Sequence, residues 1–302
     1  MVGILHGRPT HSYYSQVSQY IMKVAITASD AFVAPYIIDA LGDAAVVIPD
    51  EVLEDSMTLD VMLTPCNALI HINSRPVDTS VARNDREVKI MMREAARPVL
   101  DAVNRHGELH MIIVGTLRVH PPWSPGDDYY GPESSLSPRD TAAEGQLWIE
   151  ENALERAESG RPVSVIRASN VQGVPLQGPP GNGILHRWAS ESQIGWINVP
   201  GSGEDVKDLV HVEDLVRTVL SVLENPPLTR ESFAVGSGKG ITMSELANIY
   251  NSKTGASVEL NQNSDGEVWG IVDAWFLEHR CGFRPMISLE EMIDEALEVS
   301  GY

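Results

Sequence analysis

The sequence predicts an α/β protein: a doubly wound, Rossmann-like parallel sheet with a smaller C-terminal substrate lobe. Two observations lead to this prediction. In the first half of the chain, short apolar runs of strand length alternate with stretches of helical apolar spacing, a pattern typical of βαβ units. After about residue 170 the pattern changes, because prolines and glycines form a loop-rich stretch before shorter elements resume.

The predicted strands are short apolar runs, as expected for strands that are covered on both faces of a parallel sheet. In chain order they span residues 23–28 (KVAITA), 44–48, 67–72 (NALIHI), 111–114 and 163–167 (VSVIR). The predicted helices have apolar residues that recur at helical spacing. They span residues 32–41, 84–105 and 141–159, and an amphipathic helix spans 289–299.

This pattern divides the chain into three parts. Residues 23–169 are predicted to form the nucleotide-binding-type domain, and residues 170–302 mostly the substrate lobe, interleaved with the sheet. Residues 1–22 lack the apolar core of a signal peptide and are interpreted as an extension, for which the sequence leaves a folded and a disordered state open. A misassigned start codon is the alternative explanation.

The chain is strongly acidic, with a formal net charge of −20 over 302 residues. Such a surface repels phosphate groups, so nucleic acid and anionic membranes are not expected as partners. The longest apolar runs are also too short to span a bilayer. Cys66 and Cys281 are far apart in the sequence and are expected to be reduced thiols in a cytoplasmic protein.

Four segments of the second half match motifs of a known family. They are 167–173 (RASNVQG), 207–215 (KDLVHVEDL), 233–246 (FAVGSGKGITMSEL) and 281–291 (CGFRPMISLEE). With them, the chain resembles the extended short-chain dehydrogenases of the NAD-dependent epimerase/dehydratase family from about residue 23 to its C-terminus. The resemblance implies a Rossmann-type fold, an NAD or NADP cofactor and a small-molecule substrate, often a nucleotide-diphosphate sugar.

The cofactor loop departs from the family pattern. The family's first strand ends in T-G-x-x-G-x-x-G, whose glycines let the backbone approach the pyrophosphate. Here residues 27–34 read TASDAFVA, so all three glycines are alanines. The added Cβ atoms narrow the slot and strain any position that needs a positive φ. By resemblance, the cofactor-binding positions are Ala28, Ala31, Phe32, Val33 and Asp50.

Two acidic residues near this loop have alternative interpretations. Asp30 stands at the entrance of the predicted helix, where backbone N–H groups would otherwise receive a phosphate, and we predict that it is the helix N-cap. Asp50 follows the second strand, where an acidic residue often holds the adenine ribose. The alternative for Asp50 is a solvated loop carboxylate.

The catalytic residues of the family are only partly present. Proton transfer there depends on a Ser or Thr, a Tyr, and a Lys four residues beyond the Tyr. Thr116 falls on the Ser/Thr position, whereas Ala142 and Gln146 fall on the Tyr and Lys positions. Alanine cannot carry a proton and glutamine cannot supply a cation, so the sequence predicts that the hydride chemistry of the Tyr/Lys pair is lost.

Other side chains could carry protons instead. His120 replaces a family tyrosine close to Thr116, and histidine titrates near neutral pH. Tyr130 and its neighbour Tyr129 lie in a loop that could fold over the pocket, and Glu144 lies on the predicted helix. The alternative is that all of these are surface residues of a loop or helix.

The predicted substrate lobe keeps part of a ligand site. Asn170 matches the family's pocket asparagine, and Lys207 stands where a phosphate-binding arginine is common. A second base is expected within 261–267 (NQNSDGE) but none occurs there, which leaves Arg187 as a candidate replacement. Alternatively, Lys207 and Asp208 form a surface pair of little energetic value. No Cys, His and carboxylate cluster suggests a metal site.

The sequence therefore favours a divergent family member that has lost the Tyr/Lys chemistry and keeps a small-molecule or nucleotide-sugar-type pocket for a binding or regulatory role. Two alternatives stay open: an enzyme using Thr116 with His120 or a loop tyrosine, and an active NAD(P)-dependent epimerase, dehydratase or reductase. By resemblance, helices 84–105 and 141–159 are expected to form a homodimer. A heteromer with an active paralogue is the other expected assembly.

Overall fold

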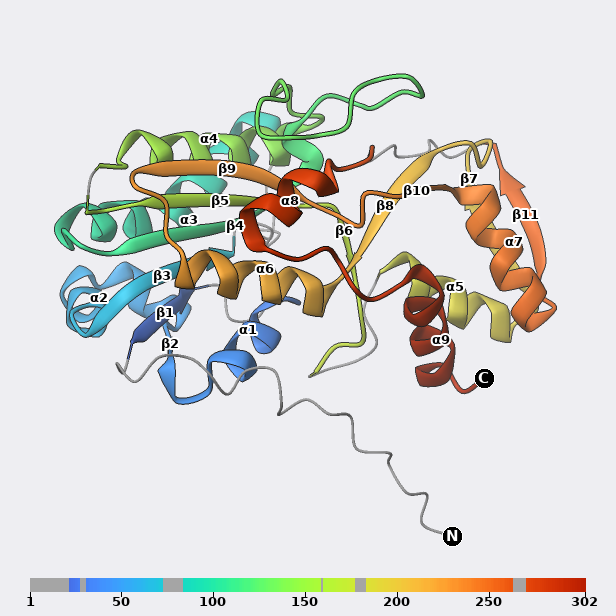
Figure 1. Cartoon of the computed structure of the whole chain (residues 1–302), viewed down its shortest axis with the longest axis horizontal. Coiled ribbons are helices and arrows are strands. Elements are labelled where there is room, and N and C mark those ends of the chain that lie inside the picture. The colour runs from blue at the N-terminus through green and yellow to red at the C-terminus, as the bar shows by residue number, and fades with distance from the viewer. Residues whose placement is uncertain (1–21, 28–30, 73–83, 159, 177–182, 263–269) are drawn as a thin grey trace, which may run out of the picture.

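The computed structural model describes residues 22–27, 31–72, 84–158, 160–176, 183–262 and 270–302. Its centre is a parallel sheet of six strands in the order β2-β1-β3-β4-β5-β9 (Figure 1). These strands are β1 (Lys23–Thr27), β2 (Ala45–Val47), β3 (Cys66–Ile72), β4 (His110–Thr116), β5 (Val163–Ala168) and β9 (Arg230–Val235). The doubly wound α/β fold predicted from the sequence is confirmed.

Helices cover both faces of this sheet, and this is why its strands are almost continuously apolar. On one face lie α2 (Ser56–Leu63), α3 (Asp85–Arg105) and α4 (Thr141–Glu155), and on the other α1 (Ala34–Leu41), α6 (Val212–Glu224) and α8 (Ala274–Cys281). Alternate residues of β4 enter the two cores: Met111 and Ile113 face α3 and α4, whereas Ile112 and Val114 face α1 and α6. Short 3₁₀ helices are η1 (Gly42–Ala44), η2 (Asp50–Glu54) and η4 (Leu117–Val119).

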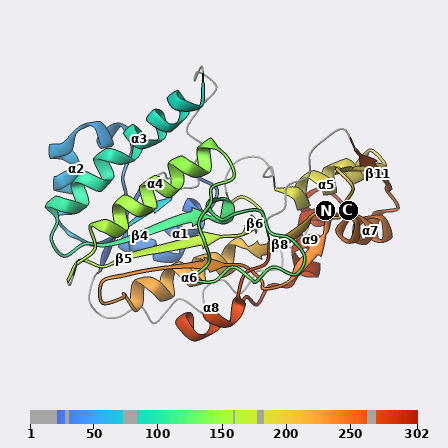
Figure 2. The ribbon, with the colours of Figure 1, turned by 90° about the horizontal axis from the view of Figure 1, so that it is seen from above.

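A second body of structure follows the sheet and has its own core (Figure 2). It contains α5 (Ile184–Gln193), β7 (Trp196–Pro200), α7 (Met243–Thr254), β11 (Ser257–Asn261) and α9 (Leu289–Val299). Trp188 and Tyr250 are fully buried there, edge to face at 6.0 Å. A three-stranded sheet of β10 (Gly240–Thr242), β8 (Val206–His211) and β6 (Asn170–Gln172) lies between this lobe and the main sheet.

Most element boundaries agree with the predicted ones to within a few residues, and the last helix spans 289–299 as predicted. The entrance of α1 differs. This helix begins at Ala34, and its N-cap is Val33, which makes no side-chain capping bond. The prediction that Asp30 is the N-cap is therefore wrong, since the capping position lies three residues later; Asp30 itself lies outside the described residues.

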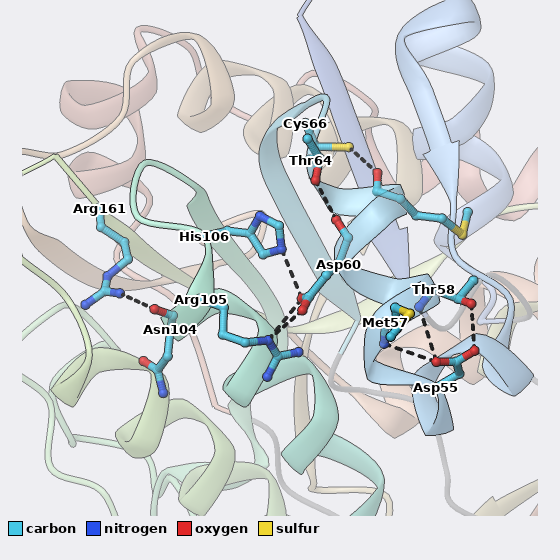
Figure 3. Close-up of polar contacts among 11 residues, drawn as sticks. Asp55, Met57, Thr58, Asp60, Thr64, Cys66, Asn104, Arg105, His106 and Arg161 are labelled. Carbon is cyan, nitrogen blue, oxygen red and sulfur yellow. Dashed lines mark hydrogen bonds and ion pairs between the residues drawn. The ribbon is translucent and has the colours of Figure 1, made fainter.

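Polar contacts fix α2 against the end of α3 (Figure 3). Asp60 accepts hydrogen bonds from Nε of Arg105 at 2.9 and 3.0 Å, and its Oδ1 lies 3.1 Å from Nε2 of His106. Asp55 caps the start of α2 by accepting from the N–H groups of Met57 and Thr58. The hydrogen bond from Arg105 lowers the pKa of Asp60, with a smaller contribution from His106.

Replacing Asp60 with asparagine is expected to lower the free energy of unfolding at neutral pH by less than about 1 kcal/mol, because the contact is partly exposed. A carboxyl whose pKa is lowered by folding stabilises the fold above its unfolded pKa, and this contribution is lost as pH falls through the folded pKa. The loss should therefore disappear in acid. Urea unfolding followed by circular dichroism at neutral pH and near pH 3 measures it. An undiminished loss in acid would contradict the ionic explanation, and Glu94→Gln, in an exposed pair with Arg97, is the control.

In the described ranges, no helix combines the length and the apolar character needed to cross a bilayer.

Candidate functional site

A pocket of about 410 Å³ opens at the carboxyl ends of the central strands. The ends of β4 and β5, the segment before α1, and α4 contribute its walls. Strand order reverses at β1, because β2 lies on one side of it and β3 on the other. Ligands of open α/β sheets bind in the crevice at this edge, beside such a reversal. The pocket therefore occupies the position where the fold favours a ligand.

The pocket has an apolar wall and a polar end. Phe32, Val33, Val114 and Leu215 supply apolar side chains. The polar groups are those of Thr116, Arg118, Gln146, Ser169 and Asn170. Of the site residues predicted from the sequence, the structure thus brings together Thr116, Asn170 and three cofactor positions, Ala31, Phe32 and Val33.

Thr116 ends β4, and its side chain is mostly buried. Its Oγ1 accepts a hydrogen bond from the backbone N–H of Arg118 at 3.3 Å. Because a hydroxyl both accepts and donates, this contact leaves the O–H hydrogen of Thr116 for a ligand.

Arg118 is a pocket residue that the sequence analysis did not identify. Its guanidinium is paired with Asp140, with Nε 3.1 Å from Oδ2 and Nη2 on the same oxygen. Asp140 is itself fixed, because its Oδ1 caps α4 by accepting from the N–H of Ala143 at 2.9 Å. The one available signal was an Asp directly before a predicted helix, a common N-cap arrangement. Nothing in the local sequence pairs it with an arginine 22 residues earlier.

The two positions that the sequence predicts to correspond to the family's Tyr and Lys are on the first turns of α4. Ala142 is exposed and ends in a methyl group. Gln146 is mostly buried and lines the pocket with a neutral amide. Neither group can exchange a proton at physiological pH, so this side of the pocket offers hydrogen bonds without acid–base chemistry.

His120 and Tyr130 are buried next to each other and do not line the pocket. Their rings stack at 4.8 Å, and Nδ1 of His120 lies 2.9 Å from the Ser135 carbonyl. Tyr130 donates to the Pro121 carbonyl and accepts from Nη2 of Arg139 at 3.1 Å. Burial lowers the pKa of His120 to about 4 and raises the pKa of Tyr130. The interpretation of these two as surface residues is therefore wrong.

The interpretation as surface residues does hold for Tyr129 and Glu144. Tyr129 is about half exposed, and Glu144 on α4 forms an exposed ion pair with Lys89 of α3. The catalytic role considered for His120 and Tyr130 stays a prediction. The burial of both side chains gives it no support, because a proton carrier must reach the reacting group.

A buried ion pair lies directly behind the pocket wall. Nε of Arg167 on β5 is 2.9 Å from Oε2 of Glu150 on α4, and neither side chain is more than 3% exposed. Burial raises the pKa of Glu150 to about 7, although Arg167 opposes this shift. Gly115 separates the pair from the pocket: a Cβ there would lie 2.5 Å from Oε1 of Glu150. The sequence analysis placed Glu150 on the helix but did not predict its partner.

The remaining predicted site residues lie elsewhere. Asp50 is exposed in η2 and does not line the pocket, and Ala28 lies outside the described residues. Lys207 is buried in β8 rather than lining the pocket. Its neighbour Asp208 is fully buried, so the alternative of a Lys207–Asp208 surface pair is wrong. Among the described residues, no group of three His, Cys, Asp or Glu side chains is placed to hold a metal.

Two backbone N–H groups at the start of α1 are already used within the chain. The N–H of Ala34 donates to the carbonyl of Ala31 at 2.9 Å, and that of Ile37 donates to Val33 at 3.2 Å. Pro35, in the first turn, has no N–H at all. A dinucleotide pyrophosphate normally binds to free N–H groups at this helix terminus.

Comparison with known proteins identifies the family. The model of the NAD dependent epimerase/dehydratase family matches residues 53–236, more than half of the chain. The chain belongs to this family. A curated relative, "Putative GDP-L-fucose synthase 2" from Oryza sativa subsp. japonica, is 25% identical over 216 residues. That match covers 65% of this chain and 60% of the relative, so the chain matches less than two thirds of the relative's length.

Solved structures share the fold over nearly the whole chain. MoeE5 in complex with UDP-glucuronic acid and NAD has a TM-score of 0.77 at 18% identity, covering 92% of this chain and 98% of that one. TunA, an NAD-dependent NDP-hexosamine 5,6-dehydratase, has a TM-score of 0.76 at 20% identity, covering 92% and 97%. RMD from Pseudomonas aeruginosa, complexed with NADPH, has a TM-score of 0.75 at 16% identity, covering 93% and 98%. The fold is that of NAD-dependent nucleotide-sugar epimerases and dehydratases.

Proposed function

We propose that this family member binds a small molecule or nucleotide-sugar-type ligand for a binding or regulatory role and does not catalyse Tyr/Lys-dependent hydride transfer. One observation carries the proposal: Ala142 and Gln146 occupy the positions of the proton carrier and its cation on α4, and Gln146 lines the pocket with Thr116. Among the described residues that line the pocket, none is a base that could activate Thr116. The removal of an acid/base group costs about two to four decades of rate.

No other described side chain that lines the pocket restores this chemistry. His120 and Tyr130 are buried outside it, and the raised pKa of Tyr130 opposes the deprotonation that the family's tyrosine needs. Glu150, whose pKa of about 7 would suit a proton carrier, is separated from the pocket by Gly115. The polar end of the pocket therefore serves recognition, through the donors and acceptors of Thr116 and Asn170.

The positions that would bind the cofactor also differ from the family pattern. The alanines at 31 and 34 place Cβ atoms where the family has glycine, and Ala34 is completely buried at the start of α1. With Pro35 in the first turn, this helix terminus lacks one of the N–H donors that a pyrophosphate would use. Both features support a ligand other than NAD or NADP.

Titration of the purified protein with NADH and NADPH, followed by ligand fluorescence and calorimetry, tests the proposal. We expect no binding up to millimolar cofactor. A matched variant, Ala28→Gly/Ala31→Gly/Ala34→Gly/Pro35→Ala, restores the glycine loop and the missing N–H and is expected to gain affinity for NADH. Micromolar binding by the unmodified protein, with turnover of a nucleotide sugar, would instead establish an active oxidoreductase.

A further inference from the structure

A second cavity, of about 480 Å³, lies at the opposite edge of the central sheet from the pocket that Thr116 lines. Its walls come from the amino ends of β3 and β4, from the segments before β1 and β5, and from the end of α6 with the turn after it. Much of the described lining is apolar, and it includes Pro162, Leu223, Pro226, Pro227 and Leu228. A cavity of this size and lining accommodates a small ligand whose orientation is fixed by a few polar groups.

One of these polar groups is His110, the first residue of β4, which lines the cavity and is only 5% exposed. Its side chain lies on the same face of β4 as Ile112 and Val114, the face that α6 covers. Its Nδ1 is buried and has no hydrogen-bond partner among the described residues. A buried polar atom without a partner is unfavourable, so a ligand group that pairs with Nδ1 gains from this contact.

A chain of hydrogen bonds determines which nitrogen of His110 carries the proton. Arg280 donates to both oxygens of Glu231, from Nε at 2.6 Å and from Nη2 at 2.7 Å, so Glu231 is a carboxylate that only accepts. Ser164 donates its single O–H hydrogen to Oε1 of Glu231 at 2.8 Å. The Oγ of Ser164 can therefore only accept from Nε2 of His110, which lies 3.0 Å away.

The proton of the neutral ring is thus on Nε2, and Nδ1 is left as an acceptor. Burial lowers the pKa of His110 to about 4, so the ring is neutral at physiological pH. The cavity consequently presents an unprotonated nitrogen that pairs only with a hydrogen-bond donor.

A second acceptor lines the same cavity. Glu108 lies two residues before His110 and is exposed. Among the described lining residues there is no Lys or Arg, and the net charge of the protein is −20. A ligand group that donates hydrogen bonds and carries a positive charge matches both the nitrogen of His110 and the carboxylate of Glu108.

We propose that this cavity is a second ligand site, which binds a small organic cation with N–H donors, such as an amidinium, on an apolar body. In this arrangement one N–H group donates to Nδ1 of His110, and Glu108 supplies the opposite charge. The apolar body contacts the prolines and leucines of the lining. The site is separate from the pocket that Thr116 lines and does not depend on the function proposed for that pocket.

Benzamidine, benzamide and benzoate test the proposal, because the three have nearly the same shape. The polar group of benzamidine only donates, that of benzamide donates and accepts, and that of benzoate only accepts. By ligand-observed NMR and calorimetry at low ionic strength, benzamidine is expected to bind at least about tenfold tighter than benzoate, with benzamide between them. His110→Phe keeps a ring without the acceptor, and the O–H of Ser164 still has Glu231, so this variant should weaken benzamidine about tenfold.

An exposed substitution keeps the test independent of misfolding. Glu108→Gln should weaken benzamidine several-fold and leave benzamide unchanged, because only the charge is removed. Glu94→Gln makes the same charge change in an exposed pair with Arg97 and should leave both affinities unchanged. In ¹⁵N-labelled protein, long-range ¹H–¹⁵N correlation should show the proton of His110 on Nε2, and the Nδ1 resonance should move when benzamidine is added.

Equal affinities for benzamidine and benzoate, no binding of benzamidine at millimolar concentration, or a proton on Nδ1 of His110 would each overturn the inference. So would an affinity for benzamidine that survives both His110→Phe and Glu108→Gln. Thr116→Val, in the other pocket, should leave benzamidine binding unchanged. A loss of binding in that variant would assign the probe to the other pocket and would equally contradict the proposal.

Discussion

Replacing Arg167 with methionine is expected to lower the free energy of unfolding by about 3 to 5 kcal/mol above pH 7, the usual cost of removing one partner of a buried ion pair. Glu150 has no exposed surface, and its Oε2 is 2.9 Å from Nε of Arg167. Methionine has a similar unbranched shape but leaves the carboxylate buried without a cation. Urea unfolding followed by tryptophan fluorescence measures the loss.

The pH dependence of this loss in stability shows whether the unpaired charge of Glu150 causes it. Burial raises the pKa of Glu150 to about 7, and loss of Arg167 removes the group that opposes this rise. A carboxyl whose folded pKa is raised contributes most to stability below its unfolded pKa, and that contribution is lost as pH rises through the folded value. The difference between the Arg167→Met variant and the unmodified protein should therefore be largest near pH 8 and smaller near pH 5.5, where Glu150 is protonated.

A second substitution provides the control. Adding Glu150→Gln to Arg167→Met removes the charge that would otherwise be buried alone, so the double variant should be more stable than Arg167→Met at pH 8. Equal stability of the single and double variants, or a loss independent of pH, would show that the arginine acts only through its packing volume.

Replacing Asp208 with alanine is expected to cost about 3 to 5 kcal/mol, because each buried donor left without a partner costs roughly 1 to 3 kcal/mol. The fully buried carboxylate of Asp208 accepts from the N–H groups of Ser237 at 2.7 Å, Gly238 at 3.0 Å and Val272 at 3.0 Å. It thereby ties the turn after β9 and the segment before α8 to β8, where the lobe joins the sheet. Denaturant unfolding measures the loss in stability.

Two comparisons separate the contacts of Asp208. Ser237→Ala removes only the hydroxyl that donates to Oδ1 at 2.6 Å and should cost about 1 kcal/mol. Asp208→Asn keeps one acceptor oxygen but turns an NH₂ group toward N–H donors, so an intermediate loss is expected. Hydrogen exchange at Gly238 and Val272 should accelerate in Asp208→Ala. Unchanged exchange at these two amides would mean that other groups hold this junction together.

The sequence predicted the fold because strands and helices leave their pattern of apolar residues within short stretches of the chain. Strands covered on both faces must be apolar throughout, and helices with one buried face must repeat that face every three or four residues. The capped starts of α7 and α9 also lie within motifs that the sequence analysis quoted, and each capping box joins residues three positions apart, Thr242 with Glu245 and Ser288 with Glu291. Such features need no knowledge of distant neighbours.

The wrong predictions for Asp30, His120 and Tyr130 concern features that depend on parts of the chain outside the local sequence. Asp30 was predicted to cap α1 from residue type alone, but the helix starts later, at Ala34. His120 and Tyr130 are residue types that are common in loops, yet both are buried. Their rings stack on each other, and Nδ1 of His120 contacts the Ser135 carbonyl. Exposure of a polar side chain depends on what the rest of the chain places over it, and a short window of sequence does not contain that information.

By itself, the sequence determined the family and the doubly wound sheet, since these depend on residue identity and short-range periodicity. It also predicts that a Tyr and a Lys are absent from their usual positions. Only the tertiary structure showed that Arg118 lines the pocket and is paired with Asp140. It also showed that Glu150 and Arg167 pair behind Gly115, and that His120 is buried outside the pocket. Each of these contacts joins residues at least 15 positions apart. Their distances are fixed by the packing of helices on the sheet, which no local pattern encodes.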